Sequence, residues 1–146
     1  MSAPSDEPYT VPTAVTFERL LAHLESGDVH VQPSGPAAVR GRWGENLLEL
    51  ALRSSAVVVL QVKGARTEPL PESAAPALVT FANDWHREHI WPTVCWTSAG
   101  DGVEVHTVFA ADVTEGASDA QLRDTFTIGI ATTNQCLTAL TDALAR

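Results

Sequence analysis

The run from Phe81 to Pro92 constrains the fold of this chain more than any other part of its sequence. A predicted helical face leads into it, with apolar or aromatic residues at helical spacing: Ala77, Leu78, Phe81, Ala82, Trp85 and His89. Pro92 disfavours helical geometry at Trp91, so we expect the helix to end near Ile90 and a strand to begin around Trp91. The run therefore predicts a corner between a helix and a strand.

Two further helices are predicted by the same spacing. The first has one apolar stripe, made by Phe17, Leu20, Leu21 and Leu24, and Gly27 can end it in a left-handed conformation. The last begins with a capping box from Ser118 to Gln121. Its apolar residues follow at helical spacing: Leu122, Phe126, Ile130, Leu137, Leu140 and Leu144. We expect this helix to run nearly to the C-terminus.

Strand signals separate these helices. Between Ala37 and Val62, three strands centre on Val39, Leu47–Leu52 and Val57–Val62, and their short links make them antiparallel neighbours. Val57–Val62 is apolar on both faces, which is typical of a central strand that is covered at least partly on both sides.

A second hairpin follows the corner. Trp91–Thr97 and Val103–Val113 flank Asp101-Gly102, a dipeptide that favours a tight hairpin turn. Four residues of the later strand would share one face: Val103, Val105, Thr107 and Phe109. With a proline-containing linker over residues 67–76, the predicted order is α-β-β-β-α-β-β-α, an antiparallel sheet with helices packed on it, of the α+β class.

The length of 146 residues fits one domain with a core of its own. We expect a single domain over residues 15–146 and a flexible tail over residues 1–14, which contain three prolines and no periodicity. No apolar stretch approaches the roughly 18 residues of a membrane span. The first residues have neither the basic nor the apolar region of a secretory signal, so we expect a cytoplasmic protein.

The net charge of −9 argues against nucleic acid and anionic membranes as partners, because phosphate contacts need a surplus of cations. The charge is uneven, however. Residues 40 to 66 carry a local charge of +3, from Arg40, Arg42, Arg53, Lys63 and Arg66 against Glu45 and Glu49. This segment is either a solvated strand face or a surface that orients an acidic partner or a second copy of the chain.

Two pairs of side chains resemble chemical sites. His86 and His89 lie three apart on a helix and could touch one metal ion, but a third ligand is missing and the motif is not HExxH. Cys95 and His106 fall on adjacent strands, where cross-strand pairing could form a thiolate and imidazole pair without an orienting third group. We therefore predict no catalytic residue, no metal ligand and no bound cofactor.

The remaining reactive side chains have structural explanations. Cys95 and Cys136 lack a CxxC spacing, and we expect both to be buried free thiols. Asp112 and Glu115 precede the last helix, whose dipole favours carboxylates near its N-terminus.

Four tryptophans are many for a chain with 6% aromatic residues. Trp85 and one of Trp91 and Trp96 are expected in the core; since Trp91 and Trp96 would face opposite sides of a strand, the other is expected to be exposed. Gly129 costs a helix interior about 1 kcal/mol relative to alanine, which close approach by another backbone would explain. The expected partner or dimer contacts are Trp43, Trp91, Trp96 and Gly129.

Three motifs together resemble the YbjN domain of bacteria: Phe81-x-Asn83-x-Trp85 through Trp91-Pro92, Gly116-x-Ser118-x-x-Gln121-Leu122, and Gly129-Ile130-x-Thr132. The resemblance covers residues 15 to 144, with the specific motifs in 74 to 144. His86 stands where family members often have asparagine. The resemblance implies a fold like that of type III secretion chaperones, small acidic proteins that often dimerise and hold segments of other proteins. The family's label is a sensory-transduction regulator, and it supplies no catalytic positions.

The favoured function is a non-enzymatic protein-binding module, chaperone-like or regulatory, that acts as a homodimer on an unidentified protein partner. The alternative is a regulatory domain that responds to a small ligand or a metal through His86, His89 or the hairpin of Cys95 and His106.

Overall fold

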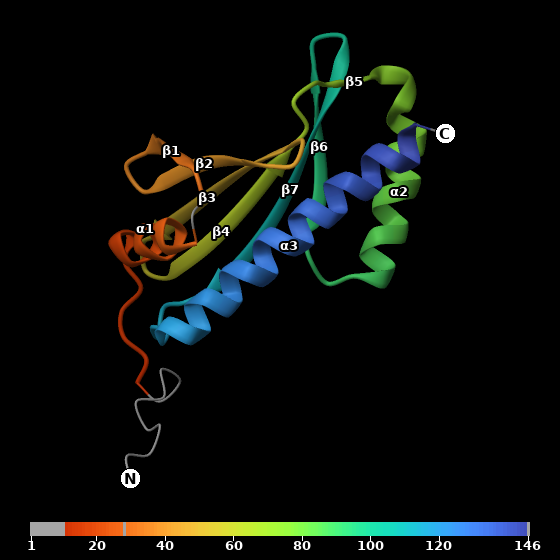
Figure 1. Cartoon of the computed structure of the whole chain (residues 1–146). Helices are drawn as coiled ribbons and strands as arrows, with labels where there is room; N and C mark the ends of the chain where they lie inside the picture. Colours follow the sequence, from red (N-terminus) through yellow and green to blue (C-terminus); the bar gives the residue numbers. More distant parts are fainter. Residues whose placement is uncertain (1–10, 28, 146) are drawn as a thin grey trace.

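The computed structural model describes residues 11–27 and 29–145, which form three α-helices and a seven-stranded sheet (Figure 1). The helices are α1 (Phe17–Ser26), α2 (Ala75–Glu88) and α3 (Asp119–Leu144), and a 3-10 turn, η1 (Glu72–Ala74), leads into α2. The strands are β1 (Val31–Gly35), β2 (Ala38–Trp43), β3 (Asn46–Ser54), β4 (Val58–Ala65), β5 (Leu70–Pro71), β6 (Thr93–Ala99) and β7 (Gly102–Asp112). The predicted α+β class is confirmed.

All pairs of neighbouring strands are antiparallel. The path runs β1-β2-β3-β4-β7, and β5 and β6 both pair with β7. Because β6 and β5 both pair with Gly102 and Val103, they lie on opposite sides of β7, and β5 continues the line of β4. The two long edges of the sheet are therefore β1 and β6, and the sheet twists visibly between them (Figure 1).

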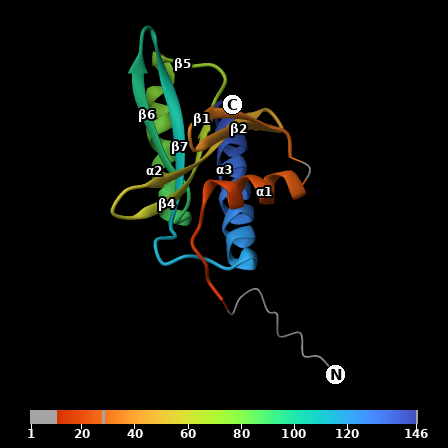
Figure 2. The ribbon, with the colours of Figure 1, turned by 90° about the vertical axis from the view of Figure 1, so that its left-hand side faces the viewer.

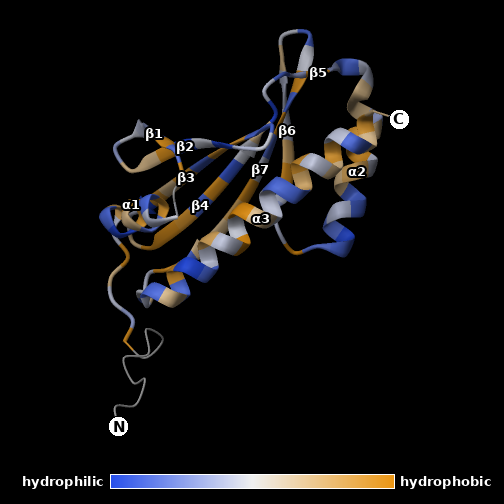
Figure 3. Ribbon diagram, viewed as in Figure 1, coloured by the Kyte–Doolittle hydropathy of each residue, from blue (hydrophilic) through white to orange (hydrophobic). Residues whose placement is uncertain are grey.

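The helices lie on one face of the sheet. In β3 and β4, alternate residues such as Leu50, Leu60 and Val62 are fully buried, while most of their neighbours on the other face, such as Glu49, Val59 and Gln61, are half-exposed; the small Ala51 is buried on that face too. Helix α3 crosses the length of that face, whereas α1 and α2 cover opposite ends of it (Figures 1 and 2). The alternation of apolar and polar residues along the strands, visible in Figure 3, is the sequence pattern that makes one face apolar.

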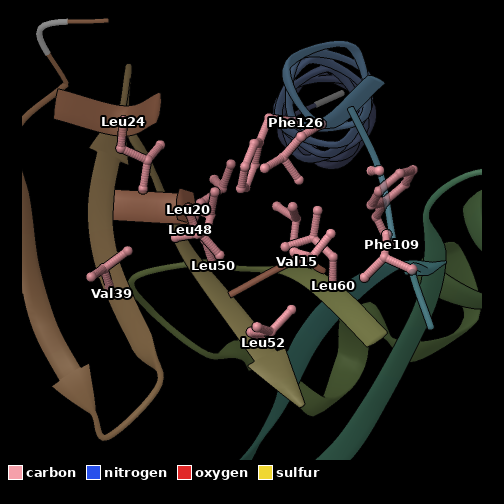
Figure 4. Close-up of a cluster of buried hydrophobic side chains, with 14 of the residues drawn as sticks. Val15, Leu20, Leu24, Val39, Leu48, Leu50, Leu52, Leu60, Phe109 and Phe126 are labelled. Atoms are coloured by element: carbon pink, nitrogen blue, oxygen red, sulfur yellow. The ribbon is translucent and has the colours of Figure 1, made fainter. Parts of the chain in front are cut away.

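The larger core cluster joins α1, α3 and the strands β2, β3, β4 and β7 (Figure 4). Its buried residues are Val15, Leu20, Leu24, Val39, Leu48, Leu50, Leu52, Leu60, Val62, Phe109, Val113, Ala117, Leu122, Phe126 and Leu137. Leu20 and Leu24 are the buried residues of α1, as the predicted apolar stripe requires. Complete burial of a leucine side chain contributes about 1.5–3 kcal/mol each.

A second cluster lies under α2. It joins Leu78, Ala82 and Trp85 to β5, to the β6–β7 hairpin and to α3: Leu70, Val94, Val103, Val105, Cys136 and Leu140. Phe81 is partly buried and packs against this cluster, and its ring stacks on that of Trp85 with ring centroids 5.9 Å apart. Leu78, Ala82 and Trp85 of the predicted apolar face are therefore buried against the following hairpin and α3, whereas Ala77 and His89 are exposed.

Two glycines let α3 approach the sheet closely. A Cβ on Gly64 of β4 would lie 2.6 Å from Thr107 Oγ1 and 2.7 Å from Leu137 Cδ1. A Cβ on Gly129 of α3 would lie 2.8 Å from the ring of Phe109. These distances are too short for a side chain, so glycine is required where helix and strand meet.

The structure adds strands that the pattern did not predict. β1 contains Pro33 and Gly35 and shows no alternation of buried and exposed residues, and the two-residue β5 lies in the predicted linker. The expectation for the central strand is corrected, since within 11–27 and 29–145 the helices cover only one face of β4. Val59 is half-buried on the other face. The strand is central because β3 and β7 pair with its two edges, while its second apolar face is only partly buried.

Three local predictions differ in detail. Gly27 has φ −87°, so α1 does not end in a left-handed residue. The β6–β7 turn uses Gly100, with φ +58°, and Asp101, since Ala99 pairs with Gly102. Gly102 instead permits close approach of β5, because a Cβ there would lie 2.5 Å from the carbonyl oxygen of Leu70.

The corner between α2 and β6 lies where it was predicted, although both elements stop short of it. α2 ends at Glu88 and β6 begins at Thr93, with a cis peptide bond between Trp91 and Pro92. At the other end of the chain, the capping box of α3 is confirmed: Gln121 N–H donates to Ser118 Oγ, and Ser118 N–H donates to Gln121 Oε1.

Most of the predicted tail, residues 1–10, lies outside the described residues. Thr13 forms an antiparallel bridge with Ala117. Arg19 fastens this junction, since its guanidinium donates to the carbonyl oxygens of Thr13, Ala14 and Ala117 and to Asp119 Oδ1. In the described part of the chain, no helix is long and apolar enough to cross a membrane.

Candidate functional site

The strand residues that point away from the helices form a surface that we call the open face. It includes Ala38, Arg40, Arg42, Leu47, Glu49, Ala51, Arg53, Val59, Gln61, Lys63, Ala65, Thr93, Cys95, Thr97, Glu104, His106, Val108, Ala110 and Asp112. Among the described residues, no helix packs on this side. Such a sheet face is available to a partner.

The cations of the open face come from neighbouring strands. Every charged side chain of β1 to β4 lies on it: Arg40, Arg42, Arg53 and Lys63, opposed by Glu49. Four cations and one carboxylate give this half of the sheet a charge of +3, in a chain whose net charge is −9. The positive segment predicted from the sequence is thus a strand face, although Arg66 is directed to α3, where it donates to Thr141 Oγ1.

Arg40, Arg42, Arg53, Lys63 and Glu49 form what we call the positive strip, and its one carboxylate already has partners. Glu49 accepts a hydrogen bond from the hydroxyl of Ser34 on β1, and its Oε2 lies 4.0 Å from an Arg40 nitrogen. Arg53 Nε donates to Gln61 Oε1 at 3.2 Å. In 11–27 and 29–145, Arg42, Arg53 and Lys63 form no ion pair with a carboxylate.

The outer edge of β6 is a second unpartnered feature. Val94 N–H donates to His86 Nε2 at 2.9 Å, so this amide points away from β7. Because strand amides alternate in direction, the N–H groups of Trp96 and Ser98 point the same way. Within the described ranges, β6 pairs only with β7, so these groups face outward without a neighbouring strand.

The two edges of the sheet differ in their protection. β1 contains Pro33, which lacks an N–H, and its register with β2 shifts between Pro33 and Gly35. Both features discourage pairing with another chain. β6 has no proline and no charged residue in Thr93–Ala99. Among the described residues, His86 caps one amide of this edge, and the rest of β6 is the edge that can accept a further strand.

The tryptophans lie on the helix side of the sheet. Trp91 packs edge-on against Phe109, with ring centroids 5.3 Å apart. Trp96 pairs with the buried Val105 and is 36% exposed beside the edge of β6. Because Trp91 precedes the strand, the expectation that Trp91 and Trp96 face opposite sides is wrong. Trp43 is half-buried and lines a hollow of about 620 Å³ between α1 and α3.

Gly129 is buried between α3 and the sheet of the same chain. The close neighbours that account for it are the side chains of Phe109 and Val62, rather than a backbone. The need for glycine here is therefore explained by packing within the chain.

The two histidines of α2 contact the backbone near the corner. His86 accepts from Val94 N–H, while His89 Nδ1 donates to the carbonyl oxygen of Trp85 at 3.2 Å. The His89 ring stacks on the indole of Trp85, with centroids 3.6 Å apart. Among the described residues, no group of three potential metal ligands gathers here or elsewhere. These contacts make both rings part of the structure of the corner.

Cys95 and His106 are cross-strand partners, as the sequence predicted for the hairpin. The Cys95 thiol donates to the backbone carbonyl oxygen of His106 at 3.5 Å, and His106 Nε2 lies 3.9 Å from Glu104. Cys95 is exposed, which corrects the prediction that both thiols are buried, since it lies on the open face of an edge strand. Cys136 is buried, and burial raises its pKa to about 12.

The carboxylates near α3 have structural partners. Thr114 donates to Asp112 from its hydroxyl and its N–H, and these hydrogen bonds hold the pKa of Asp112 below its ordinary value. The acidic residue in the first turn of α3 is Asp119. The hydrogen bond that it accepts from Arg19 holds its pKa below the ordinary value, although partial desolvation acts in the opposite direction and raises that pKa.

The comparisons with known proteins concern the fold and the family. The model of the YbjN family, described as "Putative bacterial sensory transduction regulator", matches residues 14–142. Among solved structures, the chain is similar to YbjN from E. coli, described as "a putative transcription regulator", with 9% identity and a TM-score of 0.66 over 89% of this chain and 91% of that chain. No curated protein sequence gave a significant match. At this identity, the structural likeness shows the fold alone.

Sequence reasoning missed the outer edge of β6. Its signal was present in Thr93–Ala99, a run without charge or proline. Whether such a run lies at an edge depends on which strands pair, and the sequence pattern does not contain that information.

Proposed function

This chain belongs to the YbjN family, and we propose that it is a non-enzymatic protein-binding module, chaperone-like or regulatory, that acts as a homodimer. The observation that carries the proposal is the unprotected outer edge of β6, beside the exposed Trp96. The free N–H and C=O groups of such an edge can form hydrogen bonds with a strand of another chain, and a neighbouring aromatic side chain supplies an apolar contact to that strand.

The self-complementarity of this edge supports a homodimer. Two copies of β6 can pair antiparallel about a two-fold axis, since the outward N–H and C=O groups of Trp96 and Ser98 meet the same groups of the other copy. Such pairing adds no charge repulsion, because Thr93–Ala99 is uncharged. It would leave both open faces on the same side of a continuous sheet, where one partner could contact both.

Several observations support a binding role over a reaction. The family description names a regulator and no reaction. The Cys95 thiol contacts a carbonyl oxygen rather than an imidazole. His86 and His89 are engaged with the backbone, and no third potential metal ligand joins them among the described residues, so the alternative of a domain that responds to a small ligand or a metal has less support. The cytoplasmic location expected from the sequence is kept as part of the proposal.

The dimer is tested by removing one outward donor of β6. Ser98→Pro deletes an N–H that β7 does not use and places a ring on the edge, while Ser98→Ala keeps the N–H. We expect size-exclusion chromatography with light scattering to give a dimer for the parent chain and for Ser98→Ala, and a monomer for Ser98→Pro. Far-UV circular dichroism of both variants checks that the fold is kept.

The partner is tested by crosslinking in native lysate followed by mass spectrometry. We expect crosslinked partner peptides to map beside β6 and on the open face, and to be reduced for Ser98→Pro. A parent chain that is monomeric at every concentration, together with crosslinks spread evenly over the helices, would remove the proposal.

A further inference from the structure

We propose that the positive half of the open face binds an acidic, extended segment of a partner polypeptide, through Arg40, Arg42, Arg53 and Lys63. The inference rests on the proposed binding function and names the chemistry of what is bound. It uses a surface separate from the β6 edge, so the two can fail independently.

The arrangement of the cations comes from the register of the sheet. Arg40 pairs with Glu49, which pairs with Lys63, so these side chains form one row across β2, β3 and β4. Arg42 is two residues from Arg40 on the same strand, and therefore about 6.6 Å further along. Alternate side chains of an extended peptide have the same spacing, so consecutive acidic side chains on one side of it can reach consecutive cations.

Small side chains on β2 and β3 lie between the row of Arg40 and Lys63 and the side chain of Arg53. Ala38 on β2 pairs with Ala51 on β3, which pairs with Gln61 on β4. A shallow depression of about 690 Å³ continues from this row to the β1–β2 turn, and its lining includes Ser34, Ala38 and Arg53. Because Ala38 is half-buried and Ala51 is 2% exposed, this row adds little bulk between the cations.

Among the described residues, three of the four cations have no carboxylate partner, and Arg40 shares Glu49 with Ser34. Glu49 is the one carboxylate among the charged residues of β1 to β4, and Ser34 and Arg40 already lie against it. In the part of the chain that the structure describes, no carboxylate lies within ion-pair distance of Arg42, Arg53 or Lys63. A partner that brings two or more carboxylates would complete these pairs.

Charge also decides between possible occupants. A second copy placed face to face would bring like charges together, because an isologous contact sets the same strip against itself. Nucleic acid is disfavoured because the remainder of the chain is strongly negative and repels a polyanion at long range, and four cations are few for phosphate binding. A short acidic polypeptide meets the strip without facing the rest of the protein.

The test uses a short fluorescein-labelled peptide of alternating glutamate and threonine, with an otherwise identical glutamine and threonine peptide as reference. We expect fluorescence anisotropy to show binding of the glutamate peptide to the full chain at low salt, and weakening as salt is raised. The glutamine peptide should bind at least about tenfold more weakly, since it cannot form ion pairs.

Charge reversal locates the site. In the double variant Arg42→Glu with Lys63→Glu, we expect affinity for the glutamate peptide to fall by about tenfold or more. The matched control reverses Arg87 and Arg123, which are exposed on α2 and α3 and give the same change in net charge away from the open face. Its affinity should change by less than about threefold, because screening weakens distant charges.

Several outcomes would overturn the inference: no binding of the glutamate peptide by the parent chain, equal binding of the glutamine peptide, or an equal loss in both double variants. Tighter binding of a single-stranded oligonucleotide of similar charge would also overturn it, in favour of nucleic acid. If Ser98→Pro stays dimeric while the glutamate peptide behaves as expected, the β6 edge is wrong and the acidic site stands.

Discussion

The two faces of the sheet are made by the same strands and differ in nearly every physical respect. On the covered face, Leu50, Leu60 and Val62 have no exposed surface. On the open face, Arg42 and Arg53 are exposed, and Val59 and Lys63 are half-buried. One face therefore provides the burial that stabilises the fold, and the other can vary in charge at little cost in stability. Changes of similar size on the two faces should have very different effects.

The largest contrast is expected between the two thiols. Cys95 is exposed on the open face, whereas Cys136 lies under α3, with its pKa raised to about 12 by burial. At about pH 8, that pKa leaves roughly one ten-thousandth of Cys136 as thiolate. We expect a disulfide reagent to label one thiol per chain quickly and the second only as the chain unfolds. Cys95→Ser should remove the fast phase; a fast phase that persists in this variant would contradict the assignment.

Core truncation gives the next largest contrast. Leu50→Ala on the covered face should lower the free energy of unfolding by about 3 kcal/mol, because it removes fully buried methyl groups and leaves a cavity. Leu47→Ala, three residues earlier on the half-exposed open face, should cost about 1 kcal/mol or less. Urea denaturation followed by circular dichroism measures both. Equal losses would mean that the open face is covered in solution.

Small additions of side-chain volume should distinguish the faces at adjacent residues. Gly64→Ala places a Cβ 2.6 Å from atoms of Thr107 and Thr133, so we expect a loss of about 1–3 kcal/mol from overpacking. Ala65→Val adds more volume on the open side and should change stability by less than about 0.5 kcal/mol. Thermal unfolding of the two variants provides the measurement, and a neutral Gly64→Ala would show that α3 lies further from the sheet.

The smallest effect concerns the junction of the N-terminal segment with α3. Arg19→Ala removes hydrogen bonds to three carbonyl oxygens and to Asp119, which should cost about 1–2 kcal/mol. Arg87→Ala breaks only an exposed pair with Asp84 and should cost about 0.5 kcal/mol or less. Hydrogen exchange at the start of α3 should rise in the first variant and not in the second.

The pH dependence of this junction has a definite sign. Folding lowers the pKa of Asp119, so its ionised form is favoured in the native state. The stabilisation is complete above the unfolded pKa and is lost as the pH falls through the lowered folded pKa. The stability difference between the parent chain and Asp119→Asn should therefore shrink below about pH 4. A difference that is unchanged down to about pH 2 would contradict the contact with Arg19.

Much of the fold was predictable from local signals. The capping box at Ser118 and the stripe of Leu20 and Leu24 each depend on residues within a few positions of one another, and they appear as predicted. β1 was missed because Pro33 and Gly35 are poor strand residues, and its place depends on pairing with β2. Cys95 was placed wrongly for a related reason, since exposure at an edge depends on the neighbouring strands.

The sequence by itself determined the class of fold, the corner from Phe81 to Pro92 and a positive segment in an acidic chain, because spacing, turn residues and charge are local properties of the chain. The tertiary structure alone decided that the positive side chains share one open face, that β6 is an unprotected edge and that Gly129 faces Phe109. Those facts depend on strand order and helix placement, which arise from contacts between residues far apart in sequence.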